Sequence, residues 1–230
     1  MHISQEKKDI IDYVYRKCKP RPTSFADLGG IWGVDGEYTF NTLREYGARR
    51  AFIVDTGFTD AALMHGKSVA NLTLVRGNFG ENKIADQIGT VDLVLLFDVL
   101  LHQVKPDWNE ILQMYSTRTT YFAVFNPQWV ASDQTVRLLD LGHDQYFKNV
   151  PHTENHPAYR DLFDKKEEIN TQRMRAWRDI HDVWQWGITD NDLKNIMGDL
   201  HFSLKYYKNY GRVGSLKNFE NHAFIFQGGF

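Results

Sequence analysis

The sequence has a single cysteine and no long run of apolar residues. One cysteine, Cys18, excludes an intrachain disulfide and a cysteine-based zinc site. No segment approaches the roughly 20 apolar residues that a membrane helix requires. The first 17 residues are too polar and charged to contain the apolar core of a secretion signal. We therefore expect a soluble, cytoplasmic protein with no membrane partner.

An excess of basic residues is also missing. The chain has 27 Lys and Arg against 29 Asp and Glu, so its formal net charge is -2. Nothing in this balance favours a nucleic-acid partner, because phosphate binding requires clustered positive charge. The 24% of charged and 42% of hydrophobic residues are typical of a globular protein. We expect a small-molecule substrate, and the sequence leaves a homodimer open.

What is present is a glycine-rich stretch, Asp27-Leu28-Gly29-Gly30-Ile31-Trp32-Gly33. A short apolar run precedes it, and a helix-like pattern from Glu37 to Tyr46 follows it. This order predicts a strand, a tight turn and a helix. Glycines in such a turn let backbone N–H groups approach a ligand, and the helix start adds a favourable partial charge. Taken alone, the turn fits an ordinary strand-to-helix connection equally well.

Apolar runs alternate with helix-compatible segments over the first half of the chain. This alternation predicts a parallel sheet with helices on both faces. The run from Val91 to Phe97 is apolar on both parities, as expected of a central strand. The predicted strands are Ser24–Leu28, Arg50–Asp55, Leu72–Gly77, Val91–Val99 and Thr120–Asn126, and the predicted helices between them are Glu37–Tyr46, Thr59–His65, Glu81–Ile88 and Asp107–Tyr115.

The alternation stops after Trp129 and resumes near Thr189. The intervening segment, residues 132–187, is too long for an idle loop. We predict a short helix at Thr135–Leu141 and a long charged helix at His156–Asp179, which would form a cap over the substrate or a purely structural lid. A helix from Thr189 to Asp199 and two closing strands, Phe202–Tyr207 and His222–Gln227, complete the chain.

These features divide the chain into three parts. Residues 1–22 form an amphipathic leading helix that ends before Pro20 and Pro22. Residues 23–131 and 188–230 form the core, and residues 132–187 form a helical cap insertion. The leading helix either covers a sheet edge or closes over a site.

The core resembles the class I S-adenosylmethionine-dependent methyltransferases. That resemblance implies a doubly wound α/β fold with a seven-stranded, mostly parallel sheet whose last strand is antiparallel. It rests on the Asp27 glycine turn, where Ile31 replaces the middle glycine, and on the residues that end the second, third and fourth strands. It implies S-adenosylmethionine as cofactor, contacted by Asp27, Gly29, Gly30, Gly33, Asp55, Thr56, Asn78, Phe79, Asp98 and Val99.

Two other functions compete with this hypothesis. A nicotinamide-linked oxidoreductase uses the same architecture, but Asp27 would repel the pyrophosphate of a dinucleotide. A methyltransferase-fold protein with other chemistry, or none, is supported only by Ile31 in the glycine turn.

Methyl transfer to a hydroxyl or amino group of a small molecule requires alignment, and a base if the acceptor is a hydroxyl. His102, four residues after Asp98, is the first candidate for the base, and His181 is the second. A packed loop histidine explains His102 about equally well. Trp129, Trp184 and Trp186 are candidates for an apolar acceptor pocket, although Trp184 and Trp186, together with Trp177, fit the core of the cap slightly better. Asp98 and Asn126 offer too few ligands for a hard cation, so we predict no metal.

Overall fold

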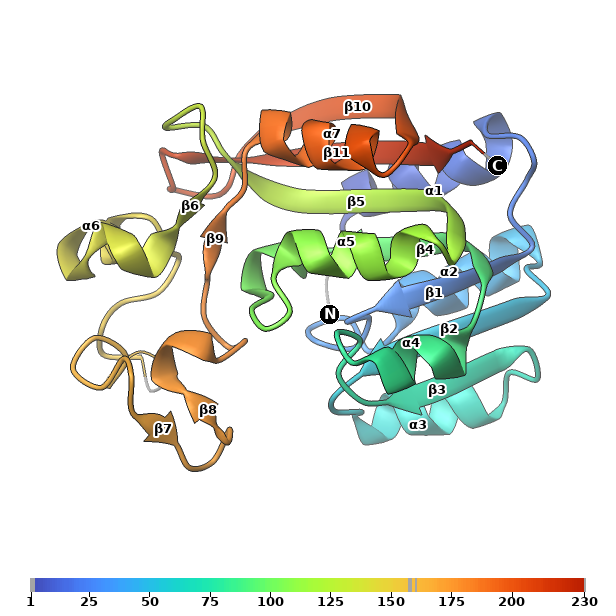
Figure 1. Cartoon of the computed structure of the whole chain (residues 1–230). Helices are drawn as coiled ribbons and strands as arrows, with labels where there is room; N and C mark the ends of the chain where they lie inside the picture. Colours follow the sequence, from blue (N-terminus) through green and yellow to red (C-terminus); the bar gives the residue numbers. More distant parts are fainter. Residues whose placement is uncertain (1–2, 157–158, 160, 230) are drawn as a thin grey trace.

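A computed structural model of the protein describes residues 3–156, 159 and 161–229. Seven strands form one sheet in the order β10-β11-β5-β4-β1-β2-β3 (Figure 1). All of them run in one direction except β11, which is antiparallel to its neighbours β5 and β10. The predicted doubly wound, mostly parallel sheet with one antiparallel strand near its edge is confirmed.

The element bounds agree closely with the predicted ones in the first half of the core. The strands of the sheet are β1 (Ser24–Leu28), β2 (Arg50–Asp55), β3 (Leu72–Arg76), β4 (Val91–Phe97), β5 (Thr119–Trp129), β10 (Phe202–Arg212) and β11 (Phe219–Gly228). The core helices are α1 (Gln5–Lys17), α2 (Glu37–Tyr46), α3 (Asp60–Lys67), α4 (Asn82–Ile88), α5 (Trp108–Ser116) and α7 (Asp190–Asp199), and the 3₁₀ turn η1 (Leu100–His102) follows β4.

The last three strands of the sheet are longer than predicted. β5 and β11 stay paired as far as Trp129 and Phe219. Their backbone hydrogen bonds continue through polar residues, which a prediction based on apolar periodicity leaves out of the strand. The longer β5 carries its carboxyl end toward residues 132–187.

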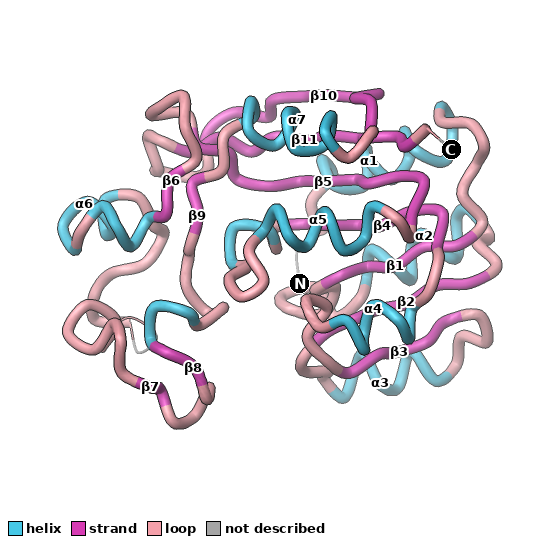
Figure 2. Tube along the Cα trace, in the orientation of Figure 1, coloured by secondary structure: helices cyan, strands magenta, loops and turns pink. Residues whose placement is uncertain are grey.

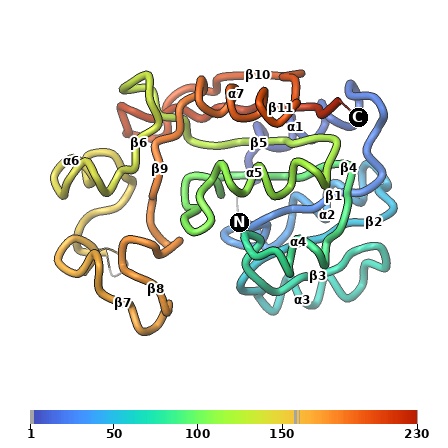
Figure 3. The backbone as a smooth tube through the Cα atoms, viewed as in Figure 1, coloured from blue at the N-terminus to red at the C-terminus, as the bar shows by residue number. Residues whose placement is uncertain are grey.

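Helices cover both faces of the sheet. The first three helices lie on one face, and α4, α5 and α7 lie on the other (Figure 1). The side chains of β4 alternate between the two layers: Leu93 and Leu95 enter one core, and Val94 and Leu96 enter the other. All four are 0% exposed, which confirms β4 as a central strand. The leading helix α1 packs behind β5 and β11 (Figure 3).

The cap is much less helical than predicted (Figure 2). Its elements are β6 (Val136–Arg137), η2 (Leu138–Leu141), α6 (His143–Lys148), β7 (Ile169–Asn170), β8 (Arg175–Ala176), η3 (Trp177–Asp179) and β9 (Trp186–Gly187). The prediction of a long helix at His156–Asp179 is wrong, since the described residues there form turns, a hairpin of the two-residue strands β7 and β8, and η3. The prediction for Thr135–Leu141 is wrong in its first half, which contains β6.

The sequence of the long predicted helix favours turns for a local reason. The side-chain oxygen of Asn170 accepts hydrogen bonds from the backbone N–H groups of Gln172 at 3.0 Å and Arg173 at 3.1 Å. Such bonds compete with helical backbone bonds and favour a turn. Met174, with φ of 52°, then reverses the chain into β8. Charge content alone, without an apolar stripe, was a poor indicator of helix.

Candidate functional site

The glycine-rich turn after β1 folds as a compact loop against the end of β2. The backbone N–H of Gly29 donates to the carbonyl of Val54 at 2.8 Å, and that of Ile31 donates to Asp55 Oδ2 at 3.1 Å. The Ile31 side chain is 4% exposed and packs between α2 and α3. Gly33, with φ of +73°, has open space around it. Ile31, which interrupts the glycine pattern, therefore anchors the loop through its buried side chain. Its backbone N–H still donates to the carboxylate at the end of β2.

Asp27 is the buried acid beneath this loop. It is 2% exposed and accepts a hydrogen bond from Thr39 Oγ1 at 2.8 Å. A Cβ atom on Gly30 would lie 2.5 Å from Asp27 Oδ2, so only glycine fits over the carboxylate. Burial raises the pKa of Asp27 to about 6, although the hydrogen bond from Thr39 and the charge of Lys7 act in the opposite direction. The Asp27 carboxylate therefore gains its full charge only above about pH 6.

Asp55 stands at the end of β2 with both carboxylate oxygens partly engaged. Oδ2 accepts from Ile31, and Oδ1 accepts from the N–H of Gly57 at 3.2 Å. Each oxygen has a second lone pair, so the group keeps the capacity to accept two further hydrogen bonds. Asp55 is partly exposed and Thr56 beside it is exposed, so both are accessible to a ligand.

Three of the predicted positions meet at Gly29. Its φ is +79°, and a Cβ atom there would lie 2.6 Å from Val99 Cγ1 and 3.7 Å from Phe79 Cε1. Both the backbone conformation and the close neighbours therefore require glycine. Nearby, Asn78 Oδ1 accepts from the N–H of Gly80 at 2.9 Å, which leaves the amide NH₂ of Asn78 as a donor.

The site contains a charged residue that the sequence patterns did not single out, Lys7 of α1. Its ammonium forms an ion pair with the carboxylate of Asp98, directly after β4. The Lys7 side chain is 13% exposed, although lysine is normally solvated. A signal for it was present in the sequence: Lys7 lies four residues after Ile3 and three before Ile10, on the apolar stripe of the leading helix. A charge on that stripe requires a partner.

His102 ends the 3₁₀ turn after β4. Its Nδ1 lies 2.8 Å from the carbonyl oxygen of Val183, at the end of the cap. Because a carbonyl only accepts, Nδ1 carries the proton and Nε2 of the neutral ring has a free lone pair. Burial lowers the pKa of His102, although the bond to Val183 and the charge of Asp98 act in the opposite direction. A neutral imidazole with an available Nε2 has the chemistry of a general base.

The cap is bonded to the segment after β4 along residues 101–105. The carbonyl of Leu101 accepts from the N–H of Gln185 at 2.9 Å, and that of Gln103 accepts from Trp186 Nε1 at 2.7 Å. The Lys105 ammonium lies 2.5 Å from a carboxylate oxygen of Asp179, whose other oxygen lies 3.0 Å from Arg137. The segment that follows β4 and the end of the cap thus form one structural unit.

His181 belongs to this unit. Its Nε2 lies 2.9 Å from the carbonyl of Val104 and 2.6 Å from Arg175 Nη1. Burial lowers the pKa of His181, although the bond to Val104 acts in the opposite direction. Nε2 either donates to the Val104 carbonyl or accepts from Arg175, and Arg175 Nη1 also donates to that carbonyl at 3.2 Å. In both cases Nε2 is occupied, so the position favours a role in docking the cap. Its role as a base stays a prediction.

The tryptophans contribute mainly to the packing between cap and sheet. Trp129 and Trp184 are 7% and 9% exposed, and both meet the ring of Phe219 edge-on with centroids 5.1 Å apart. Trp186 is partly buried, and the Arg137 guanidinium lies 5.7 Å from its ring. This placement favours the cap-core interpretation, and an acceptor contact by these residues stays a prediction.

Two features are absent from the described residues, a cluster of metal ligands and a membrane-spanning helix. Residues 3–156, 159 and 161–229 contain no group of three or more His, Cys, Asp or Glu side chains arranged to hold a metal ion. Within the same residues, no helix has both the length and the apolar character needed to cross a membrane.

Comparison with known proteins identifies the fold but no close relative. No protein-family model matches the chain, and no curated protein matches it by sequence. Among solved structures, an O-methyltransferase family protein from Burkholderia thailandensis is 14% identical with a TM-score of 0.55, over 97% of this chain and 56% of its own length. The present chain therefore spans little more than half of that protein.

Two further structures are similar over more of their own length. A 1,6-didemethyltoxoflavin-N1-methyltransferase from Burkholderia thailandensis, with bound 1,6-didemethyltoxoflavin and S-adenosylhomocysteine, has a TM-score of 0.62 at 13% identity over 98% of this chain and 79% of its own. The magnesium protoporphyrin IX methyltransferase from Synechocystis PCC 6803, with bound S-adenosylhomocysteine, has a TM-score of 0.61 at 10% identity over 98% and 83%. The chain thus has the class I methyltransferase fold, as predicted.

Proposed function

We propose that this chain binds S-adenosylmethionine at the carboxyl ends of β1 to β4 and transfers its methyl group to a hydroxyl or amino group of a small molecule. The observation that carries the proposal is the convergence at the glycine turn. A Cβ atom on Gly29 would collide with Val99 and touch Phe79, and the backbone N–H of Ile31 donates to Asp55. Four stretches that are far apart in the sequence thereby meet at one edge of the sheet, where open α/β sheets bind their ligands.

Each of these residues has a role that suits its chemistry. The free lone pairs of Asp55 accept from ribose hydroxyls, the amide of Asn78 donates to the adenine edge, and Phe79 with Val99 offers apolar surface to the base. The Asp27 carboxylate favours a cationic ligand centre. The cofactor supplies an electrophilic methyl group on a sulfonium ion. Ile31 gives no support to a protein without this chemistry, because its side chain is buried between α2 and α3.

A hydroxyl is the favoured acceptor group because of His102. The lowered pKa keeps its ring neutral at pH 7, and Nδ1 is held by Val183. Such a ring is suited to remove the hydroxyl proton as the methyl group is transferred.

The first prediction concerns the cofactor site. Asp55→Ala should weaken binding of S-adenosylmethionine by about 1.5–3 kcal/mol, roughly 10- to 150-fold, because charge-assisted hydrogen bonds to the ribose are lost. Isothermal titration calorimetry on the folded variant measures this directly. The alanine also removes the acceptor for Ile31, so Asp55→Asn, which keeps an acceptor oxygen, should lose less.

Wild-type affinity in a folded Asp55→Ala variant would remove Asp55 from the site. Displacement of S-adenosylhomocysteine by NAD would instead support the oxidoreductase alternative.

The second prediction concerns the cap, which we place on the acceptor side because it is bonded to the segment that carries His102. Asp179→Asn should destabilise the cap by roughly 1–3 kcal/mol, since Arg137 and Lys105 lose a carboxylate that is 2% exposed. Proteolysis within residues 132–187 should accelerate and kcat should fall, while cofactor affinity stays near wild type.

Asp182→Asn is the matched control, because the exposed Asp182–Arg173 pair should contribute less than about 1 kcal/mol. Equal protease resistance of the two variants would show that the Asp179 contacts do not fasten the cap.

A further inference from the structure

The ammonium of Lys7 lies among aromatic rings as well as beside a carboxylate. Its Nζ is 5.3 Å from the ring centroid of Phe125, 5.6 Å from that of Tyr38 and 5.9 Å from that of Phe97. The Asp98 carboxylate forms the ion pair. Three ring faces and one carboxylate are the groups that bind ammonium ions in proteins. We call the set Tyr38, Phe97, Phe125 and Asp98 the cation box.

Asp98 keeps capacity for a further donor. Its backbone N–H donates to the carbonyl of Phe125 at 2.8 Å, and its φ is +57°, a conformation that costs energy for a residue other than glycine. Asp98 Oδ1 is shielded from solvent and has no hydrogen-bond partner among the described residues. The strained backbone therefore presents a carboxylate of which only one oxygen is satisfied.

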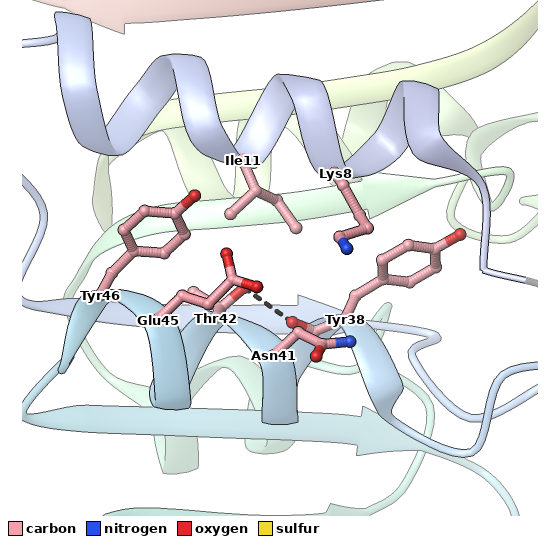
Figure 4. Close-up of a pocket in the computed structure, with 7 residues that line it drawn as sticks. All are labelled: Lys8, Ile11, Tyr38, Asn41, Thr42, Glu45 and Tyr46. Carbon is pink, nitrogen blue, oxygen red and sulfur yellow. Dashed lines mark hydrogen bonds between the residues drawn. The ribbon is translucent and has the colours of Figure 1, made fainter.

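The walls of the cation box do not depend on Lys7. Phe97 ends β4, Phe125 lies in β5, and Tyr38 lies in the first turn of α2. The rings of Tyr38 and Phe97 meet edge-on with centroids 5.5 Å apart, and the Tyr38 hydroxyl accepts from the N–H of Ser4 at 2.8 Å. Figure 4 shows Tyr38 beside the small pocket between α1 and α2, where its carbonyl accepts from Thr42.

The occupant is the movable part. The helix α1 is anchored by Ile10, Ile11 and Val14, which are 0–4% exposed. Lys7 itself reaches the box through a flexible four-carbon side chain, which can leave without displacing the helix. The box can therefore exchange one ammonium ion for another.

We infer that the cation box receives a cationic nitrogen of the methyl acceptor, and that Lys7 occupies its place in the free protein. This inference rests on the proposed function and narrows the acceptor to a hydroxyl-bearing small molecule with a protonated or quaternary amine. Phe97 belongs to β4 and Phe125 to β5, and β5 lies on the far side of β4 from the glycine turn and from Asp55, whereas Tyr38 lies in α2, which follows that turn. His102 follows Asp98 by four residues, on the same segment.

The surroundings of Lys7 argue against the opposite role, in which its charge would bind an anionic acceptor group. The charge is already neutralised by Asp98. The ring faces carry negative electrostatic potential and would repel an anion. The presence of Lys7 in the cation box also has a measurable consequence. A competing cation can bind only while the box is free of Lys7, so its apparent affinity is reduced to that fraction of the intrinsic affinity.

The experiment compares binding of tetramethylammonium to wild type and to Lys7→Ala by calorimetry or ligand-observed NMR. Lys7→Ala should bind this ion at least about tenfold more tightly than wild type. The neutral analogue tert-butanol should bind equally to both. Lys8→Ala, which removes the same side chain one residue further along α1, should behave as wild type. Lys7→Gln, which keeps most of the side-chain packing, guards against misfolding of the alanine variant and should show a gain in the same direction.

Adding Asp98→Asn to Lys7→Ala should abolish the gain. If neither Lys7 variant binds tetramethylammonium better than Lys8→Ala does, the ion pair only fastens α1 and the inference is wrong.

Saturation with S-adenosylhomocysteine separates the acceptor from the cofactor as the source of the cation. The ion should still bind to the Lys7→Ala protein loaded with this product if the box serves the acceptor. If the product blocks it, the box holds the cofactor's own ammonium group, and the acceptor assignment fails. Calorimetry with S-adenosylhomocysteine alone tests the proposed function separately, so a failure of cofactor binding is not confused with a failure of the box.

Discussion

His102→Ala is expected to lower kcat by about 10²–10⁴-fold and to leave the affinity for S-adenosylmethionine near wild type. The reason is that the ring is held by Val183 through Nδ1, so Nε2 is the nitrogen able to accept a proton. In wild type, kcat/KM should fall as pH drops through the pKa of His102, which burial places below 6.5. That acidic limb should be absent from the variant.

His181→Ala is the control for this prediction. The Nε2 of His181 is already in contact with Val104 and Arg175, so its loss should loosen the cap without removing the limb. A loss of less than about fivefold in His102→Ala, combined with loss of the limb in His181→Ala, would transfer the role of base to His181. Small losses in both variants would leave the reaction to proximity and orientation.

Asp27→Asn is expected to make the protein more stable above pH 6 and to weaken its binding of S-adenosylmethionine. The pKa of Asp27 is raised from 3.8 to about 6, so folding favours its protonated form. The contribution of Asp27 to the free energy of unfolding is fully present below pH 3.8 and is lost as pH rises through about 6. At about 1.4 kcal/mol per tenfold change in proton affinity, ionised Asp27 costs the folded state about 3 kcal/mol at pH 7. Asparagine keeps an acceptor for Thr39 and avoids this cost.

Denaturant unfolding at pH 5 and pH 8 tests the sign. The wild type should lose stability relative to Asp27→Asn between these two pH values. Asp92→Asn is the matched control with the opposite sign. Burial of Asp92 favours its neutral form, but hydrogen bonds from Thr23 and Ser24 hold its pKa below the ordinary value. Its substitution should therefore destabilise the protein at neutral pH. An Asp27→Asn protein less stable than wild type at pH 8 would contradict the prediction.

The same ionisation should appear in cofactor binding. A cationic ligand near Asp27 favours the carboxylate, so wild-type affinity for S-adenosylmethionine should rise between pH 5 and pH 7.5, with release of a proton. In Asp27→Asn the affinity should be lower and should not rise over this range. A gain in stability with a loss of binding is the pattern expected when a strained charge serves a ligand.

The alternation of apolar runs and helical segments was sufficient to predict the sheet, because the inner strands β1, β2, β4 and β5 are buried on both faces and each helix covers a neighbouring strand. The turn at Asp27 and the acid at Asp55 were also predictable, since glycine and a terminal carboxylate are local signals. The structure adds that Ile31 is an anchor, which the sequence showed only as a departure from the glycine pattern.

The cap was predicted least well. Residues 132–187 have short elements held by contacts with the core, such as those of Asp179 and Phe219, and such contacts leave no periodic trace in the sequence. A charged segment without an apolar stripe was therefore taken for a helix, although the side chain of Asn170 favours a turn there.

By itself the sequence determined the class of fold, the positions of the core strands along the chain and the residues that end those strands, because burial and backbone geometry act locally along each strand. Only the tertiary structure decided which charge neutralises Asp98 and which carbonyl orients His102. Lys7 lies 91 residues from Asp98, and Val183 lies 81 residues from His102. The energy of such pairs depends on distance in space and on exclusion of water, and the spacing of residues along the chain predicts neither of them.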